Sequence, residues 1–146
     1  MSQATELAAA KFADGFNCAQ ATLYAFAESL SISNDLALKM ACGFGAGMGG
    51  MGKVCGAISA GVCALGIKYG RDEQCDPSAT SETFQKVGEL FRQFSEKHDT
   101  VCCNNLIEGC DLSTDEGRKQ FQEKELKAKV CTPCITTAVE VIESLL

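Results

Sequence analysis

A glycine-dense loop that runs directly into a helix of small residues occupies the middle of the sequence, from Cys42 to Gly70. So many glycines let the backbone adopt positive φ angles and let other segments or a cofactor approach closely. Cys55 lies at the junction between the loop and the predicted helix. One face of that helix carries Cys55, Ser59, Val62, Cys63 and Gly66, which follow one another at helical spacing. We therefore expect this element to present Cys55 to cysteines from elsewhere in the chain.

Capping residues and apolar periodicity predict helices along the rest of the chain. No segment alternates as a strand does, and no repeat or linker divides the sequence. We therefore predict one all-α domain over residues 1–146, a compact multi-helix bundle with a glycine-rich loop. The expected helices cover 4–12, 18–30 with Asn17 as N-cap, 35–42, 77–98, 113–129 with a capping box at Ser113, and 132–146, with one or two turns within 99–109.

Ten cysteines are more than a chain of 146 residues needs for folding, because this length can bury a core of its own. We see no secretory leader and no apolar run long enough to span a membrane, so we expect a cytoplasmic protein without membrane insertion. In that reducing compartment, cysteines more often bind metals or do chemistry than form structural disulfides. The net charge of -6 argues against nucleic acid as a partner.

Several familiar cofactor motifs fail when their context is considered. The G-x-G-x-x-G run of 45–50 follows a predicted helix rather than a strand, and the near P-loop of 47–53 continues with Val54 instead of Ser or Thr. Neither pattern predicts a nucleotide site. Cys131-Thr-Pro-Cys134 is followed by Ile135 rather than histidine, which argues against haem. The methionines of the loop, Met48 and Met51, are interpreted as flexible packing residues rather than soft metal ligands.

The single histidine, His98, falls at the polar end of a predicted helix, where we expect it to face solvent. It should therefore not pair with a cysteine as a nucleophile and base do. The carboxylates of Glu116, Glu123 and Glu125 fall on a charged helix surface and suggest no general acid-base pair.

Cys18 follows the N-cap Asn17, and the free amides and dipole of a helix N-terminus favour a thiolate there. This residue also begins a wider pattern. The motifs Asn17-Cys18-Ala-Gln-Ala21, Met51-Gly-x-x-Cys55-Gly-Ala57 and Cys103-Asn-Asn-Leu106, with Cys131 ahead of the terminal helix, together resemble the C-GCAxxG-C-C family over essentially the whole chain.

The resemblance implies a redox-active protein whose hallmark is four cysteines in this order. A related domain occurs in split-Soret cytochromes, where an iron-sulfur cluster is the suggested occupant. The resemblance thus implies that cluster or metal ligands are Cys18, Cys55, Cys103 and Cys131. Cys102 competes with Cys103 for the third position, and Ala60 replaces the last glycine of the motif. We interpret Cys42 and Cys63 as packing residues.

Three functions remain open at this point. Four thiolates are the usual complement of an iron-sulfur cluster, which would serve electron transfer to a redox partner protein. Cys131 and Cys134 are instead spaced like the dithiol of a thiol-disulfide oxidoreductase or redox sensor. A structural zinc site is the third. Thin glycine and alanine helix faces are also compatible with a homodimer.

Overall fold

The computed structural model describes residues 1–146 and contains helices, turns and loops but no strand, which confirms the all-α expectation. The only strand-like pairing is an isolated antiparallel bridge between Val54 and Cys102. The helices are α1 (Gln3–Ala13), α2 (Cys18–Phe26), α3 (Asn34–Ala41), α4 (Gly56–Tyr69), α5 (Ser78–His98), α6 (Cys103–Leu106), α7 (Asp115–Glu123) and α8 (Thr132–Leu145).

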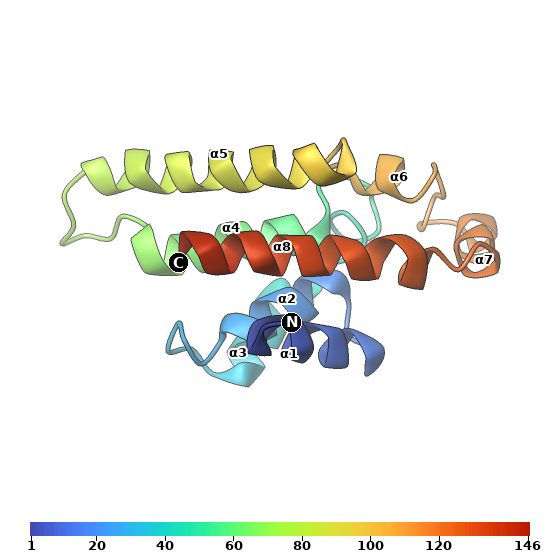
Figure 1. Ribbon diagram of the computed structural model, residues 1–146, viewed down its shortest axis with the longest axis horizontal. Coiled ribbons are helices and arrows are strands. Elements are labelled where there is room, and N and C mark those ends of the chain that lie inside the picture. The colour runs from blue at the N-terminus through green and yellow to red at the C-terminus, as the bar shows by residue number, and fades with distance from the viewer.

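The helices form three rows (Figure 1). Helices α5 and α6 make the upper row, α4 and α8 the middle one, and α1, α2 and α3 the lower one. Helix α8 packs against α1, α4 and α5, while α2 packs against α1, α3 and α4. The core therefore lies between the middle row and its two neighbours, and its largest fully buried side chains include Leu23, Ile58, Leu65, Leu90, Phe94 and Ile142.

Helix α4 buries a different face from the one that the sequence suggested. A Cβ atom added at Gly61 would lie 2.7 Å from Leu90 Cδ2 and 2.9 Å from Ile142 Cδ1, so α5 and α8 approach the helix at this glycine. At Gly66, by contrast, an added Cβ would meet nothing within 4 Å. Small and apolar residues occur on all sides of this helix, so periodicity alone did not identify the buried face. The face that the sequence analysis singled out, with Ser59, Val62, Cys63 and Gly66, is only half-buried.

Asn17 is the N-cap of α2, as predicted, and a capping box with Gln20 fixes the start of the helix, which ends at Phe26 rather than at residue 30. Asn17 Oδ1 accepts a hydrogen bond from the Gln20 amide at 3.0 Å, and Gln20 Oε1 accepts one from the Asn17 amide at 3.1 Å. Asn17 Nδ2 also donates to the Cys42 carbonyl at 2.9 Å. The same residue therefore ties the first turn of α2 to the beginning of the glycine loop.

The glycine loop is closed by its own backbone. Gly49 donates to the Gly43 carbonyl at 2.8 Å and Lys53 to the Gly47 carbonyl at 2.8 Å. Ala46 and Met48 adopt positive φ angles of 53° and 74°, which non-glycine residues rarely do outside functional sites and tight turns. Most loop amides thus donate to carbonyl groups of the loop and its first turn.

The end of the chain departs from the predicted helix boundaries. Helix α7 has Thr114 rather than Ser113 as its N-cap, and it ends at Glu123 rather than near residue 129. A π-helical turn then covers Lys127–Cys131, and the Thr132 amide bonds to the Lys127 carbonyl. Because Pro133 has no N–H, it cannot make the ordinary bond of a helix interior, and a wider turn is one way to accommodate it. Helix α8 begins at Thr132 with Pro133 in its first turn, as predicted, but the π-helical turn runs into it without a break, and Thr132 is not its N-cap.

Two smaller differences concern α3 and α5. Helix α3 is capped by Ser33 and ends at Ala41, and a 3-10 turn follows over Cys42–Phe44. In α5, Leu90 and Phe94 are buried as predicted, but Phe84 is 71% exposed.

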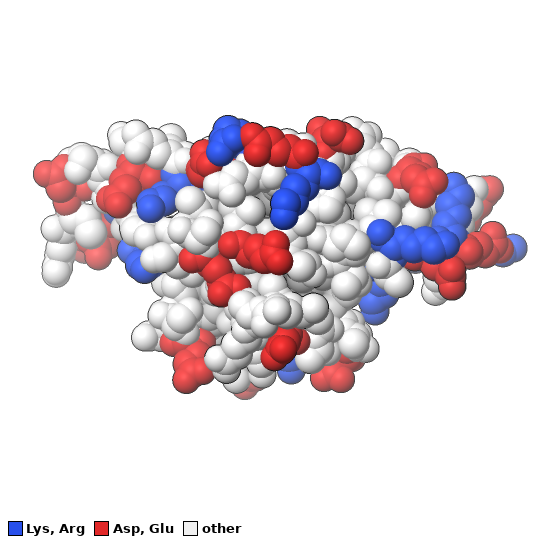
Figure 2. Space-filling model, in the orientation of Figure 1, with Lys and Arg blue, Asp and Glu red and all other residues white.

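None of the helices combines the length and the apolar character that crossing a bilayer requires. Acidic and basic side chains are interspersed over the face drawn in Figure 2, most visibly along α5 and around α7.

Candidate cysteine site

Five cysteines line one cavity of about 250 Å³. The cavity lies near the end of the bundle that carries α6 and α7, at the right in Figure 1, and its wall is mostly apolar. The five are Cys18 from α2, Cys55 just before α4, Cys103 from α6, Cys131 from the π-helical turn and Cys134 from α8. All are free thiols. The structure thus brings together, from four separate parts of the chain, the four cysteines that the resemblance singles out, with a fifth.

Three of these cysteines stand at the beginning of a helix. Cys18 and Cys103 are the first residues of α2 and α6, and Cys55 is the N-cap of α4. The backbone amides of Ala57 and Ile58 lower the pKa of Cys55 and so partly offset the rise that burial causes. Free amides and the positive end of a helix dipole stabilise negative charge on sulfur. The amides that favour a thiolate therefore come from helix α4 rather than from the glycine loop.

Two glycines let neighbouring segments reach these cysteines. A Cβ atom at Gly56 would lie 2.6 Å from Cys18 Sγ, so the first turn of α4 leaves room for that sulfur. A Cβ atom at Gly47 would lie 2.7 Å from Cys103 Cβ, so the glycine loop rests directly on the first residue of α6. The Cys103 amide also donates to the Lys53 carbonyl at 2.6 Å. The loop and α4 together hold Cys18 and Cys103 at the cavity wall.

Burial favours the protonated form of four cavity thiols, Cys55, Cys103, Cys131 and Cys134. It raises the pKa of Cys103 to about 12, that of Cys131 to about 12 and that of Cys134 to about 11. Burial likewise raises the pKa of Cys55 well above its ordinary value. In all four cases the next cause is the proximity of other cavity cysteines, of which Cys18 is named first, because negative charge on one sulfur disfavours ionisation of another nearby.

Lys127 supplies the single charged side chain of the cavity wall. Its ammonium lies 4.6 Å from the centroid of the Phe12 ring, as in a cation-π pair. Its positive charge also opposes the rise in the pKa of Cys131. A cation at this position favours negative charge inside the cavity, whether on a thiolate or on a bound group.

The thiols line the cavity wall without converging on one point. No three Cys, His, Asp or Glu side chains lie close enough together to hold a metal ion as the side chains stand. The donor set nevertheless suits a thiophilic group, because thiolates are the preferred ligands of iron-sulfur clusters and of zinc. A cluster of several iron atoms spans a larger volume than one ion does, so its ligand sulfurs lie farther apart.

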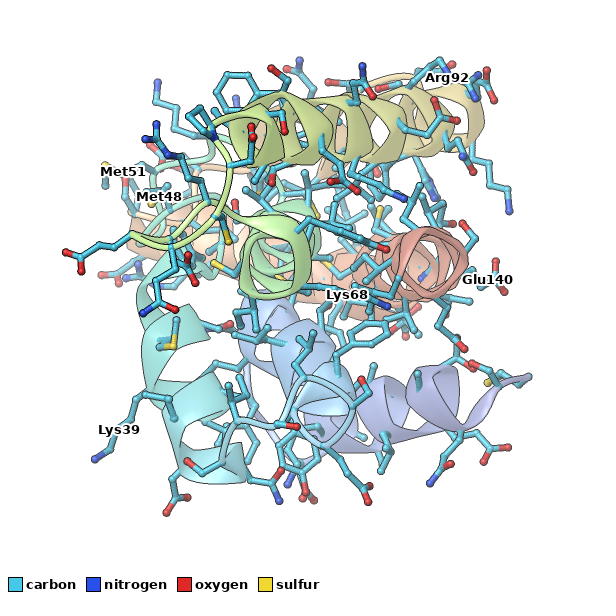
Figure 3. The ribbon with its side chains drawn as sticks, turned by 90° about the vertical axis from the view of Figure 1, so that its left-hand side faces the viewer. Lys39, Met48, Met51, Lys68, Arg92 and Glu140 are labelled. Atoms are coloured by element: carbon cyan, nitrogen blue, oxygen red, sulfur yellow. The ribbon has the colours of Figure 1, made fainter.

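The remaining sulfur side chains lie outside the cavity. Cys102 caps α6 and donates from Sγ to the Gly52 carbonyl at 3.3 Å, so Cys103 rather than Cys102 faces the cavity. Cys42 is exposed, which corrects the interpretation of it as a packing residue, whereas Cys63 packs against the core. Met48 and Met51 are 45% and 60% exposed and lie at the edge of the molecule (Figure 3), so they are not packing residues either.

The expectation that His98 lies away from the cysteines is wrong. The imidazole is half-buried, with Nδ1 3.9 Å from Cys134 Sγ and Nε2 2.8 Å from Thr137 Oγ1. Its ring packs against Phe94 with the ring centroids 4.7 Å apart. His98 is the last residue of α5, and this end of α5 lies beside α8. Sequence reasoning could not find this pair, because it depends on how two distant helices pack.

The raised thiol pKa values predict that the protein without bound metal loses stability in alkali. Above the ordinary thiol pKa of 9.0, the folded state retains protons that the unfolded state releases. The raised pKa values of these thiols therefore contribute to the free energy of unfolding fully below about pH 9. This contribution should be lost as the pH rises from about 9 toward 12. Urea unfolding midpoints at pH 8 and 10 measure the effect. The urea midpoint should fall less between pH 8 and 10 in Cys103→Ala than in the parent chain. In Cys75→Ser, at an exposed site, it should fall as much as in the parent chain. An equal fall in all three proteins would contradict the attribution of the effect to the buried cavity thiols.

Comparisons with known proteins identify the family of the chain. The family model described as "Putative redox-active protein (C_GCAxxG_C_C)" matches residues 16–145, which include all five cavity cysteines. A protein of Archaeoglobus fulgidus, described as "Uncharacterized protein", is 30% identical over 114 residues, which cover 73% of this chain and 76% of that protein. No solved structure matches the chain.

Proposed function

Because the chain belongs to the C_GCAxxG_C_C family of redox-active proteins, we propose that its redox chemistry takes place in the five-cysteine cavity and consists of electron transfer through an iron-sulfur cluster. The observation that carries the proposal is the convergence of cysteines from four parts of the chain on one cavity. The proposed ligands are Cys18, Cys55, Cys103 and Cys131.

The chain's own residues would hold and tune this group. A bound iron-sulfur cluster supplies one-electron chemistry, at a potential that depends on burial and on hydrogen bonds to its sulfurs. The apolar wall excludes water, and the amides of Ala57 and Ile58 favour negative charge on Cys55. Lys127 adds a positive charge, which favours the more reduced form of any group bound beside it. Each thiol must lose its proton on binding, so loading releases protons and is stronger at higher pH.

The spacing of the thiols favours a cluster over a single zinc ion. A structural zinc site requires four ligand atoms about 2.0 to 2.3 Å from one ion, in a tetrahedron. The cavity thiols do not form such a group, and the cavity between them measures about 250 Å³. A group with several metal atoms needs less rearrangement of the helices that carry its ligands. The geometry therefore supports the iron-sulfur cluster as the occupant.

A dithiol function remains a second candidate because Cys131 and Cys134 both line the cavity from adjacent turns of one helical segment. Cysteines three residues apart lie on the same side of a helix. Burial raises the pKa of both thiols, to about 12 and about 11, which disfavours the thiolate that such an exchange requires. Thiol-disulfide exchange at Cys131 or Cys134 therefore requires a base near one of these residues.

The experiment that separates the two candidates is a visible absorption spectrum of protein purified without oxygen, with iron, zinc, copper and acid-labile sulfide measured on the same sample. We expect brown protein with stoichiometric iron and sulfide, or colour that develops on anaerobic reconstitution with ferrous iron and sulfide. Reduction by dithionite should bleach the colour, and reoxidation should restore it. Colourless, metal-free protein after reconstitution would contradict the cluster, and bound zinc alone would favour the structural metal site.

A further inference from the structure

Cys134 is the one cavity thiol that contacts the chain's single histidine. Its Sγ lies 3.9 Å from His98 Nδ1, and the other ring nitrogen lies 2.8 Å from Thr137 Oγ1. Cys134 is 2% exposed and Thr137 is 6% exposed, so both partners of the imidazole are buried. Thr137 lies three residues after Cys134, on the same side of α8. One helix thus presents a thiol to one ring nitrogen and a hydroxyl to the other.

The hydrogen bonds are consistent with one proton arrangement. A neutral imidazole has one N–H donor and one acceptor nitrogen, and the bond at one nitrogen determines the role of the other. If Nε2–H donates to Thr137 Oγ1, Nδ1 is left with a free electron pair that faces the thiol of Cys134. The packing of the ring against Phe94 keeps it in this orientation.

The resting pair is uncharged. Burial raises the pKa of Cys134 to about 11, and burial lowers the pKa of His98, with Lys97 adding to that effect and Asp99 opposing it. A pair of this kind differs from a thiolate-imidazolium ion pair. It corresponds instead to a hydroxyl nucleophile and its histidine, where the base takes the proton only as the nucleophile attacks.

We propose that Cys134 is the thiol of this cavity that attacks low-molecular-weight disulfides, that His98 accepts its proton, and that Thr137 orients the imidazole. In the reaction, the sulfur of Cys134 bonds to one sulfur of the disulfide, and the disulfide bond breaks. The other sulfur leaves as a thiolate, and the proton passes from His98 to that sulfur or, where the leaving thiol is acidic, to solvent. The products are a mixed disulfide on Cys134 and one free thiol, so the small disulfide is the oxidant and no other redox agent is needed.

The cavity favours a small, negatively charged disulfide. Its volume of about 250 Å³ limits the size of what can enter, and Lys127 is the only charged residue of its wall. This inference goes beyond the proposed electron transfer, because Cys134 is not among the four proposed cluster ligands. It also provides the base that thiol exchange requires in this buried setting.

The test uses 5,5'-dithiobis(2-nitrobenzoate), an aromatic disulfide with two carboxylates, on the full chain purified without oxygen. Release of the coloured thiol gives the rate, and peptide mapping by mass spectrometry shows which cysteine carries the mixed disulfide. We expect a phase assigned to Cys134 that disappears in Cys134→Ser. In His98→Ala this phase should slow by roughly 100-fold, in the range that a general base contributes. Glu140→Gln, which removes the partner of Lys97 on the adjacent surface, should leave the rate unchanged.

Free imidazole distinguishes a lost base from a damaged fold. We expect added imidazole to restore a substantial part of the rate in His98→Ala and to leave the parent chain unaffected. Thr137→Val should slow the reaction less than the loss of His98 does. An unchanged Cys134 rate in His98→Ala, or a slow rate that imidazole does not restore, would overturn the proposal. The visible spectrum of each sample reports the cluster separately, so absence of the cluster with normal Cys134 kinetics would contradict only the proposed electron transfer.

Discussion

Replacing Cys18 with serine is expected to abolish stable cofactor binding. Cys18 lines the cavity from the first turn of α2, and its Sγ occupies the space that Gly56 leaves at the start of α4, where an added Cβ would lie 2.6 Å from it. Changes to residues that surround metal ligands lower metal affinity by roughly 10- to 100-fold. Removing the ligand Cys18 itself should lower the affinity for the cofactor by more than this. Iron and sulfide per chain, measured after anaerobic reconstitution, give the result.

The matched control is Cys63→Ser, at a half-buried cysteine that lies outside the cavity. It should retain full iron and sulfide, with at most a modest loss of stability from the added hydroxyl. Serine at the other three proposed ligands, Cys55, Cys103 and Cys131, should also prevent stable loading. If Cys18→Ser binds iron and sulfide as the parent chain does, Cys18 is not a ligand and the proposed set is wrong.

Gly56→Ala is expected to have the second largest effect, because the added methyl group competes with a cysteine for space. Its Cβ would lie 2.6 Å from Cys18 Sγ, 3.0 Å from the Phe44 carbonyl oxygen and 3.1 Å from Ala19 Cβ. Backbone and helix atoms surround this position, so the sulfur is the group that must move. We expect a severalfold loss of bound iron, together with about 1 to 3 kcal/mol of destabilisation from overpacking.

Two other glycines of α4 serve as controls for this substitution. Gly66→Ala meets nothing within 4 Å, so it should keep full iron and stabilise the helix by about 0.5 to 1 kcal/mol. Gly61→Ala presses on Leu90 and Ile142 in the core, so it should lower stability without removing iron. Urea unfolding and iron analysis on all three variants separate the effects. Equal iron content in Gly56→Ala and Gly66→Ala would contradict the close approach of Cys18 to α4.

Local signals predicted most of the helices well, because caps and apolar spacing act within a few residues. The N-cap at Asn17, the start of α5 after Asp76-Pro77 and the start of α8 at Thr132 are examples. The main error near the end of the chain concerns what precedes α8. Helix α7 ends at Glu123, and a π-helical turn over Lys127–Cys131 runs into α8 without a break. No local feature of the sequence indicated that turn.

The candidate site was only partly accessible from sequence. The resemblance singled out four cysteines, but spacing along the chain could not show that they share one cavity, since that depends on the packing of α2, α4, α6 and α8. The fifth thiol had a local signal, because Cys134 follows Cys131 by three residues on a helix. The contact between His98 and Cys134 had none. A polar residue at a helix end is usually solvated, and only the position of α5 beside α8 makes this one an exception.

The measurement that tests the central claim most directly is alkylation of the cluster-loaded and metal-stripped protein under anaerobic conditions, with every cysteine quantified by mass spectrometry. Loading should protect Cys18, Cys55, Cys103 and Cys131 together, while Cys134 reacts in both states. Protection confined to Cys131 and Cys134, or no protection of Cys18, would contradict a cluster held by cysteines from four parts of the chain.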